Sequence, residues 1–127
     1  MTKRKQSKIL VVEDNHLTMA LLRTVLGSEG YEVLEAATAS EGLEVARRSQ
    51  PDLIIMDIQL PDMSGYDATR ILKSENPTKG IPVLVTSAYG DDADKKRLAE
   101  CGCDIYVPTP ISVADFVQRV RRLIGDG

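Results

Sequence analysis

Three acidic side chains follow two short apolar runs, and their spacing indicates chemistry. The run 9–12 leads directly into Glu13 and Asp14, and the run 53–56 leads directly into Asp57. Short β-branched runs are typical of buried parallel strands, whose carboxyl ends face the crevice where open α/β sheets bind ligands. Converging carboxylates repel one another, and a hard divalent cation such as Mg²⁺ or Ca²⁺ relieves that repulsion. The pattern therefore predicts an acidic metal pocket.

A carboxylate beside bound Mg²⁺ can attack a phosphoryl group and form an aspartyl phosphate, because the metal neutralises the developing charge. Asp57 is the preferred nucleophile since it ends a central strand alone, whereas Glu13 and Asp14 are better placed to hold the metal. The hydroxyls of Thr86 and Ser87 follow a later apolar run and could donate to phosphoryl oxygens. A single acid at a strand end is usually a solvated charge, but three on neighbouring strands favour a site.

The elements that must position these groups alternate along the whole chain. Strands are expected near 8–13, 31–36, 52–57, 81–87 and 104–107, and helices near 15–29, 38–49, 64–75, 91–101 and 112–124. This alternation is typical of βαβ units around a parallel sheet. We expect an α/β protein of the flavodoxin-like (βα)5 type, a three-layer sandwich with strand order 2-1-3-4-5. In that order the first and third strands are neighbours, which brings the three acids together.

Length and composition narrow the possible classes of protein. The 127 residues, 43% hydrophobic and 28% charged, fit one soluble globular domain over residues 8–125 behind a basic tail over 1–7. A formal net charge of −3 does not support nucleic-acid binding as the main function. No apolar run approaches the ~20 residues that span a bilayer, and no secretion signal is recognisable. We therefore expect no membrane insertion and a cytoplasmic location.

Cys101 and Cys103 are separated only by Gly102. Two thiols cannot complete a four-ligand zinc site when the only histidine, His16, is far away in the sequence. A disulfide across a single residue would be strained. We interpret the two cysteines as small side chains that pack where a helix meets a strand.

Four motifs stand at the ends of the expected elements: Val12-Glu13-Asp14-Asn15, the stretch from Pro51 to Gly65, Ser87-Ala88, and Gly102-Cys103-Asp104 leading to Pro110. With these motifs the chain resembles the receiver domain of bacterial two-component response regulators. The resemblance covers essentially the whole chain, and it is strongest toward the stand-alone receivers of the cell-cycle and cell-fate type.

The resemblance implies a role for each matching residue. Asp57 would accept a phosphoryl group from a histidine kinase or a histidine phosphotransfer protein. Asp14 and Asp57 would bind Mg²⁺ directly, Glu13 would bind it through water, and the backbone carbonyl of Gln59 would complete the protein ligands. Such a domain is a signalling protein rather than an enzyme, although it assists its own phosphorylation and dephosphorylation.

Two further positions match the residues that change conformation in receivers. Ser87 corresponds to the switch hydroxyl that turns toward the phosphoryl group, and Tyr106 corresponds to the switch aromatic. Their coupled movement would remodel the face formed by the fourth helix, the fifth strand and the fifth helix. That face would then bind a downstream protein target.

One position departs from the family pattern. Receivers normally carry a lysine immediately before the proline of the last loop, where this chain has Thr109. A threonine offers one neutral hydrogen bond, about half as strong as the charge-assisted bond of a lysine. Two interpretations stay open: the domain works with Mg²⁺ alone, or its phosphorylation is impaired and it acts as a protein-interaction module.

Two other classes fit the residues less well. An aspartyl-phosphate phosphohydrolase would need a second aspartate two positions after Asp57, where this chain has Gln59. A flavodoxin would need a glycine- and hydroxyl-rich phosphate loop after the first strand, and Glu13 and Asp14 would repel the phosphate of a flavin.

The first helix carries apolar residues on two sides. The side expected to pack on the sheet comprises Leu17, Ala20, Leu21, Thr24 and Val25. Met19, Leu22 and Leu26 form a second stripe at helical spacing. If that stripe is exposed, it predicts docking to the helical hairpin of a histidine kinase or phosphotransfer protein, with His16 and Arg23 at the rim. The alternative is a single wide buried arc that includes Leu22.

Overall fold

The computed structural model describes residues 6–87, 92–108 and 112–124. Its elements in chain order are β1 (Lys8–Val12), α1 (His16–Ser28), β2 (Glu32–Ala36), α2 (Ala39–Ser49), β3 (Leu53–Asp57), α3 (Gly65–Ser74), β4 (Val83–Ser87), α4 (Asp92–Cys101), β5 (Ile105–Pro108) and α5 (Val113–Ile124). Each agrees with its predicted bounds to within two residues. Among the described residues, no helix is long and apolar enough to cross a membrane.

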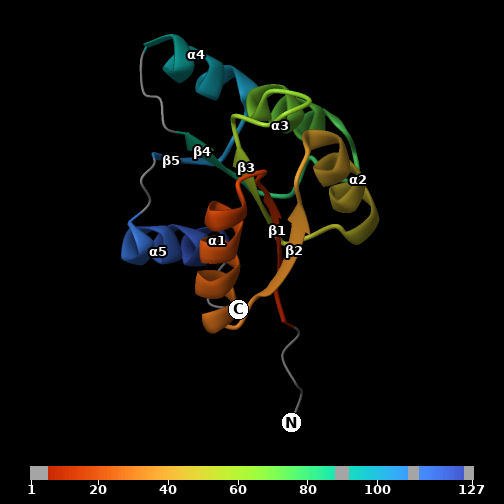
Figure 1. The fold of residues 1–127 in the computed structure, drawn as a ribbon. Coiled ribbons are helices and arrows are strands. Elements are labelled where there is room, and N and C mark those ends of the chain that lie inside the picture. Colours follow the sequence, from red (N-terminus) through yellow and green to blue (C-terminus); the bar gives the residue numbers. More distant parts are fainter. Residues whose placement is uncertain (1–5, 88–91, 109–111, 125–127) are drawn as a thin grey trace.

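The strands form one parallel sheet in the order β2-β1-β3-β4-β5 (Figure 1). This confirms the predicted flavodoxin-like fold and strand order. β1 lies between β2 and β3, and the register pairs Val12 with Met56. The carboxyl ends of β1 and β3 therefore meet at the same edge of the sheet, where the acidic residues follow.

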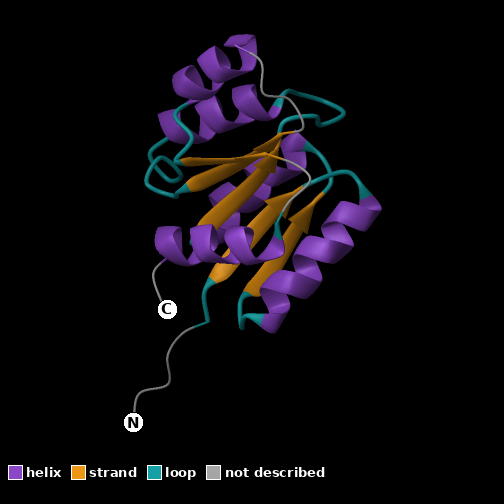
Figure 2. Ribbon diagram, turned by 90° about the vertical axis from the view of Figure 1, so that its left-hand side faces the viewer, coloured by secondary structure: helices purple, strands orange, loops and turns teal. Residues whose placement is uncertain are grey.

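Both faces of the sheet are covered by helices, as Figure 2 shows. One face packs against α2, α3 and α4 through a core that includes Leu10, Ile54 and Leu72. The opposite face packs against α1 and α5 through a core that includes Val11 and Phe116. Because successive strand residues face opposite sides and both sides are covered, residues 9–12 of β1 and 53–56 of β3 are all buried, which explains the continuous apolar runs.

The inner face of α1 differs from the prediction. Met19, Leu22 and Leu26 are 8%, 2% and 0% exposed and belong to the core between α1 and the sheet, so the docking stripe predicted from them is wrong. Leu17 and Leu21, which were expected to pack on the sheet, are 83% and 45% exposed. The buried stripe consists only of large apolar side chains, whereas the side expected to be inside also includes Ala20 and Thr24, so the observed orientation buries more apolar surface.

Candidate metal centre

Three carboxylates meet where β1 and β3 end. One oxygen from each of Glu13, Asp14 and Asp57 lies within 4.8 Å of the other two, as the sequence predicts. Glu13 is buried, Asp57 is half-buried and Asp14 is exposed, so the group opens to solvent on one side. We call these three residues the carboxylate cluster. Oxygen ligands at this spacing suit a hard divalent cation.

The electrostatics of the carboxylate cluster also favour a cation. Burial, together with the nearby charges of Asp57 and Asp14, raises the pKa of Glu13 to about 7, against a hydrogen bond from the Asn15 N–H to Glu13 Oε2 (3.0 Å). Burial likewise raises the pKa of Asp57, against a hydrogen bond from the Gln59 N–H to Asp57 Oδ1 (3.3 Å). Negative charge is therefore unfavourable here until a cation balances it.

The loop after β3 is held tightly against Asp57. The Gly65 N–H donates to the Ile58 carbonyl at 2.8 Å, and Gln59 pairs with Ser64 in an isolated bridge. A Cβ atom on Gly65 would lie 2.2 Å from the Asp57 carbonyl oxygen, so only glycine fits at the start of α3. The backbone that presents the Gln59 carbonyl is thus fixed next to Asp57.

Asp62 anchors the same loop to the start of α2. Its carboxylate accepts hydrogen bonds from the Ala39 N–H (2.8 Å), the Ser40 N–H (2.9 Å) and the Ser40 hydroxyl (2.7 Å). These bonds, that of the Ser40 hydroxyl foremost, lower the pKa of Asp62 to about 2. This contact could not be predicted from the sequence, because Ala39 and Ser40 lie 23 and 22 residues away from Asp62 and no local pattern signals it.

β4 and β5 border the carboxylate cluster on its other side. Thr86 pairs with Asp57 in the sheet register, but its side chain is only 4% exposed. Adjacent strand residues face opposite sides, so Thr86 and Ser87 cannot both face the cluster, and the burial of Thr86 makes it the weaker candidate. Tyr106 on β5 is half-buried against the core under α2 and α3. The side chain of Ser87 and all of Thr109 lie outside the described residues.

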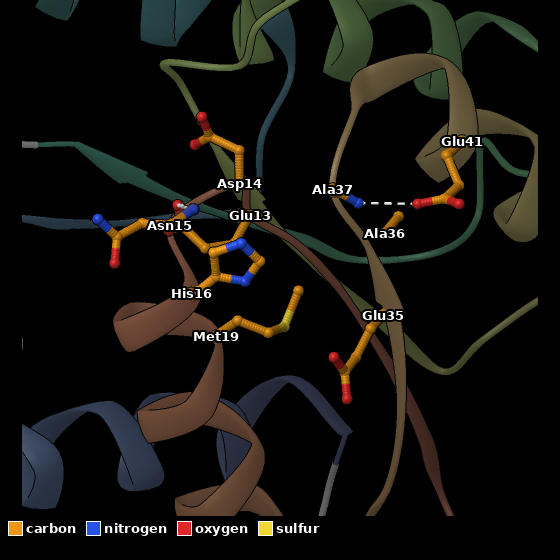
Figure 3. A pocket seen from close by; sticks show the side chains of 9 residues that line it. All are labelled: Glu13, Asp14, Asn15, His16, Met19, Glu35, Ala36, Ala37 and Glu41. Atoms are coloured by element: carbon orange, nitrogen blue, oxygen red, sulfur yellow. Dashed lines mark hydrogen bonds between the residues drawn. The ribbon is translucent and has the colours of Figure 1, made fainter.

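A pocket of about 190 Å³ adjoins the carboxylate cluster between α1 and the loop that follows β2. Figure 3 shows its lining, which comprises Glu13, Asp14, Asn15, His16, Met19, Glu35, Ala36, Ala37 and Glu41. His16 is exposed at the start of α1 and lines this pocket. Arg23 pairs with Glu35 across the α1–β2 interface at 3.0 Å.

A family model described as the response regulator receiver domain matches residues 9–121. The polar-differentiation response regulator DivK of Brucella anthropi is 39% identical over 118 residues, which cover 93% of this chain and 96% of that protein.

Solved structures of a response regulator and of a receiver domain have a similar fold. A putative response regulator from Chloroflexus aurantiacus has a TM-score of 0.89 at 32% identity, covering 94% of this chain and 98% of that one. The receiver domain of a sensor histidine kinase from Pseudomonas aeruginosa has a TM-score of 0.88 at 29% identity, covering 95% and 99%, and holds a magnesium ion in its active-site cleft. With the sheet order and the three carboxylates in place, this chain belongs to the response regulator receiver domain family of two-component systems.

Proposed function

We propose that this protein is a receiver that accepts a phosphoryl group on Asp57 and signals through the resulting change of its protein-binding face. The observation that carries the proposal is the carboxylate cluster, whose oxygens lie within 4.8 Å of one another at the sheet edge. In the reaction a carboxylate oxygen of Asp57 forms a bond to phosphorus, while the bond from phosphorus to the donor's histidine nitrogen breaks. The donor is a histidine kinase or a histidine phosphotransfer protein.

We place Mg²⁺ in the carboxylate cluster, with Asp14, Asp57 and the Gln59 backbone carbonyl as direct ligands and Glu13 as a ligand through water. Bound there, Mg²⁺ would balance the charge that develops on the phosphoryl oxygens. The contacts of Gly65 and Asp62 support this assignment, because they hold the β3–α3 loop in one position beside Asp57.

We assign the phosphorylation-dependent change to Ser87 and Tyr106. β4 ends at Ser87, one residue beyond the strand partner of Asp57, and the burial of that partner, Thr86, leaves Ser87 as our choice for a bond to the phosphoryl group. Tyr106 pairs with Val85 in the adjacent strand and is partly buried, so it lies at the boundary between the core and the surface. Such a movement would alter the α4–β5–α5 face that a downstream protein contacts.

We place the contact with the phosphoryl donor on the outer face of α1. Leu17 and Leu21 are 83% and 45% exposed, one helical turn apart. α1 begins two residues after Asp14, so the outer face of α1 starts close to the carboxylate cluster in the chain. A protein that presents a phosphohistidine to Asp57 would cover it, and the two leucines suit an apolar helix face on that protein.

Labelling with a small phosphoryl donor tests the central proposal. Acetyl phosphate with Mg²⁺ should add one phosphoryl group to the wild-type chain, and Asp57→Asn should abolish the labelling. Asp52→Asn is a matched control, because Asp52 is an exposed acid outside the carboxylate cluster. Labelling that persists undiminished in Asp57→Asn would place the acceptor elsewhere.

Thr109 favours a second candidate function, an interaction module with impaired phosphorylation. Thr109 replaces the lysine that would supply a cation to the phosphoryl oxygens, and the three residues of the carboxylate cluster are all acidic. Thr109→Lys should then raise the labelling yield and prolong the phosphorylated state. Equal yield and lifetime in both forms would make Thr109 a neutral substitution and remove the support for the second candidate.

A further inference from the structure

The thiols of Cys101 and Cys103 lie together at the junction between α4 and β5. Cys101 is the last residue of α4, and Cys103 stands two residues before β5. The Cys101 Sγ donates to the Leu98 carbonyl oxygen at 3.3 Å, and the Cys103 Sγ lies 3.9 Å from that oxygen. The two thiols also hydrogen bond to each other. Both sulfurs are thus held in one small space.

The backbone between them makes this approach possible. Gly102 has a φ of +82°, in the left-handed region, so the chain turns sharply between the cysteines. Consecutive Cα atoms are about 3.8 Å apart, and a turn at the middle residue brings the flanking Cα atoms into the ~4.4–6.8 Å range of disulfides. The strain expected from the sequence is therefore reduced by the turn at Gly102.

The two sulfurs differ in access and in proton affinity. Cys101 is 2% exposed, and Cys103 is half-buried. The hydrogen bond from Cys103 lowers the pKa of the Cys101 thiol to about 6, whereas the same contact and burial raise the pKa of Cys103. Cys101 is therefore the more acidic thiol, Cys103 holds the proton that it donates to the Cys101 sulfur, and Cys103 is the sulfur that solvent reaches.

We propose that Cys101 and Cys103 form a reversible dithiol site that reacts with low-molecular-weight disulfides such as glutathione disulfide. Cys103 passes its proton to Cys101 and attacks one sulfur of the reagent, the reagent's S–S bond breaks, and the leaving glutathione takes up that proton and departs as a thiol. The Cys101 thiolate then attacks the Cys103 sulfur and releases the second glutathione thiol. Two electrons pass from the protein to the reagent, and an intramolecular disulfide remains.

The oxidised pair would exchange the contacts to Leu98 for a covalent link between the end of α4 and the start of β5. Neither cysteine belongs to the carboxylate cluster. The site therefore lies apart from the proposed phosphorylation chemistry, and labelling by acetyl phosphate can serve as a control for an intact fold.

Equilibration of the full-length chain with mixtures of reduced and oxidised glutathione, followed by acid quenching, alkylation and mass spectrometry, tests the proposal. The expected product is a monomer that has lost a pair of hydrogens and both alkylation sites and that regains them on reduction. The folded chain should form this product at a lower proportion of glutathione disulfide than the same chain in urea. A disulfide that forms more readily in urea, or only between molecules, would overturn the proposal.

Single variants separate the roles of the two sulfurs. Cys101→Ala should accumulate a mixed disulfide with glutathione at Cys103, because no second thiol resolves it. Cys103→Ala should react more slowly, on the order of tenfold, because its remaining thiol is buried. Equal rates would contradict the assigned order of attack. If Cys101→Ala loses its fold, the comparison of wild type with Cys103→Ala decides the same point, since both keep the buried thiol.

Discussion

The inner face of α1 and the carboxylate cluster are two regions in which burial has opposite consequences. Leu22 and Leu26 are 2% and 0% exposed on the inner face, and their burial removes apolar surface from water. Glu13 is almost as deeply buried, at 8% exposure, but it carries a carboxylate beside those of Asp14 and Asp57. Burying these groups opposes folding unless a proton or a cation neutralises them.

This difference separates side chains that stabilise the domain from side chains that make the site. Functional sites keep groups that are unfavourable in the folded state, because those groups are what binds a metal or a substrate. If the comparison holds, substitutions in the two regions should change stability in opposite directions. The largest effect is expected on the inner face of α1, and the smallest at Asp62.

Truncation of the inner face of α1 should cost the most stability. Leu22→Ala leaves a cavity between α1 and the sheet, and it should lower the free energy of unfolding by about 2–4 kcal/mol. Leu21→Ala removes the same atoms one residue earlier at an exposed position and should change it by less than ~0.5 kcal/mol. Urea denaturation of both variants measures the difference, and equal losses would mean that the two faces are not distinct.

Neutralising one acid of the carboxylate cluster should raise the free energy of unfolding rather than lower it. In metal-free buffer, Asp57→Asn should raise the free energy of unfolding by roughly 0.5–2 kcal/mol, because it removes a half-buried charge from beside two others. Millimolar Mg²⁺ should then stabilise the wild type and leave the variant nearly unchanged, since ligand binding stabilises only a protein that holds the ligand. Thermal unfolding with EDTA and with Mg²⁺ measures both effects.

A metal-free Asp57→Asn protein that is less stable than the wild type would contradict the comparison. It would mean that the contacts of the Asp57 carboxylate, such as the bond from the Gln59 N–H, outweigh the repulsion. Asp52→Asn again serves as the control for losing one exposed acid. It should not respond differently to Mg²⁺ from the wild type.

The parts of the molecule that could be predicted from sequence are those with local signals. The apolar runs ending in Glu13 and Asp57 indicated both the strands and the carboxylate cluster, because a buried parallel strand is continuous in sequence. The side of α1 that packs on the sheet was predicted wrongly, because both sides of this helix carry leucines. Side-chain size was the unused signal, since the predicted inner side included the small Ala20 and the polar Thr24.

Contacts between distant segments could not be predicted. Asp62 accepts hydrogen bonds from Ala39 and Ser40 at the start of α2, which lie 23 and 22 residues away in the sequence. The residues next to Asp62 give no sign of these partners. The Cys101–Cys103 pair was visible as a spacing, but its shared contact with Leu98 depends on how α4 ends. Such contacts follow from the packing of whole elements rather than from a short pattern.

The outer face of α1 should affect transfer rather than stability. Leu17→Glu places a charge at a position that is 83% exposed, so the midpoint of thermal unfolding should stay nearly unchanged. Phosphoryl transfer from a phosphorylated protein donor should slow by about tenfold, since an apolar contact is lost from the interface. Labelling by acetyl phosphate should be unaffected, because that donor does not touch α1.

Thr24→Glu is the matched control, since Thr24 is exposed on the same helix nearer its end. It should leave transfer close to the wild-type rate. Equal slowing in both variants would indicate a general effect of negative charge, and unchanged transfer in Leu17→Glu would mean that the donor binds elsewhere.

The smallest expected effect concerns Asp62, an exposed carboxylate that stabilises the loop beside the carboxylate cluster instead of opposing folding. Its hydrogen bonds to Ala39 and Ser40 lower its pKa to about 2 from the ordinary value of 3.8. A carboxyl whose pKa is lower in the folded state stabilises the fold above its unfolded pKa, and this contribution disappears as the pH falls through the folded value. Asp62→Asn should therefore lower the unfolding midpoint by a few degrees at pH 7, and the difference from wild type should shrink between about pH 4 and pH 2.

Thermal unfolding across that pH range measures the difference, with Asp67→Asn as the control, since Asp67 is exposed on α3. A difference that stays constant down to pH 2 would show that Asp62 acts through its shape rather than its charge.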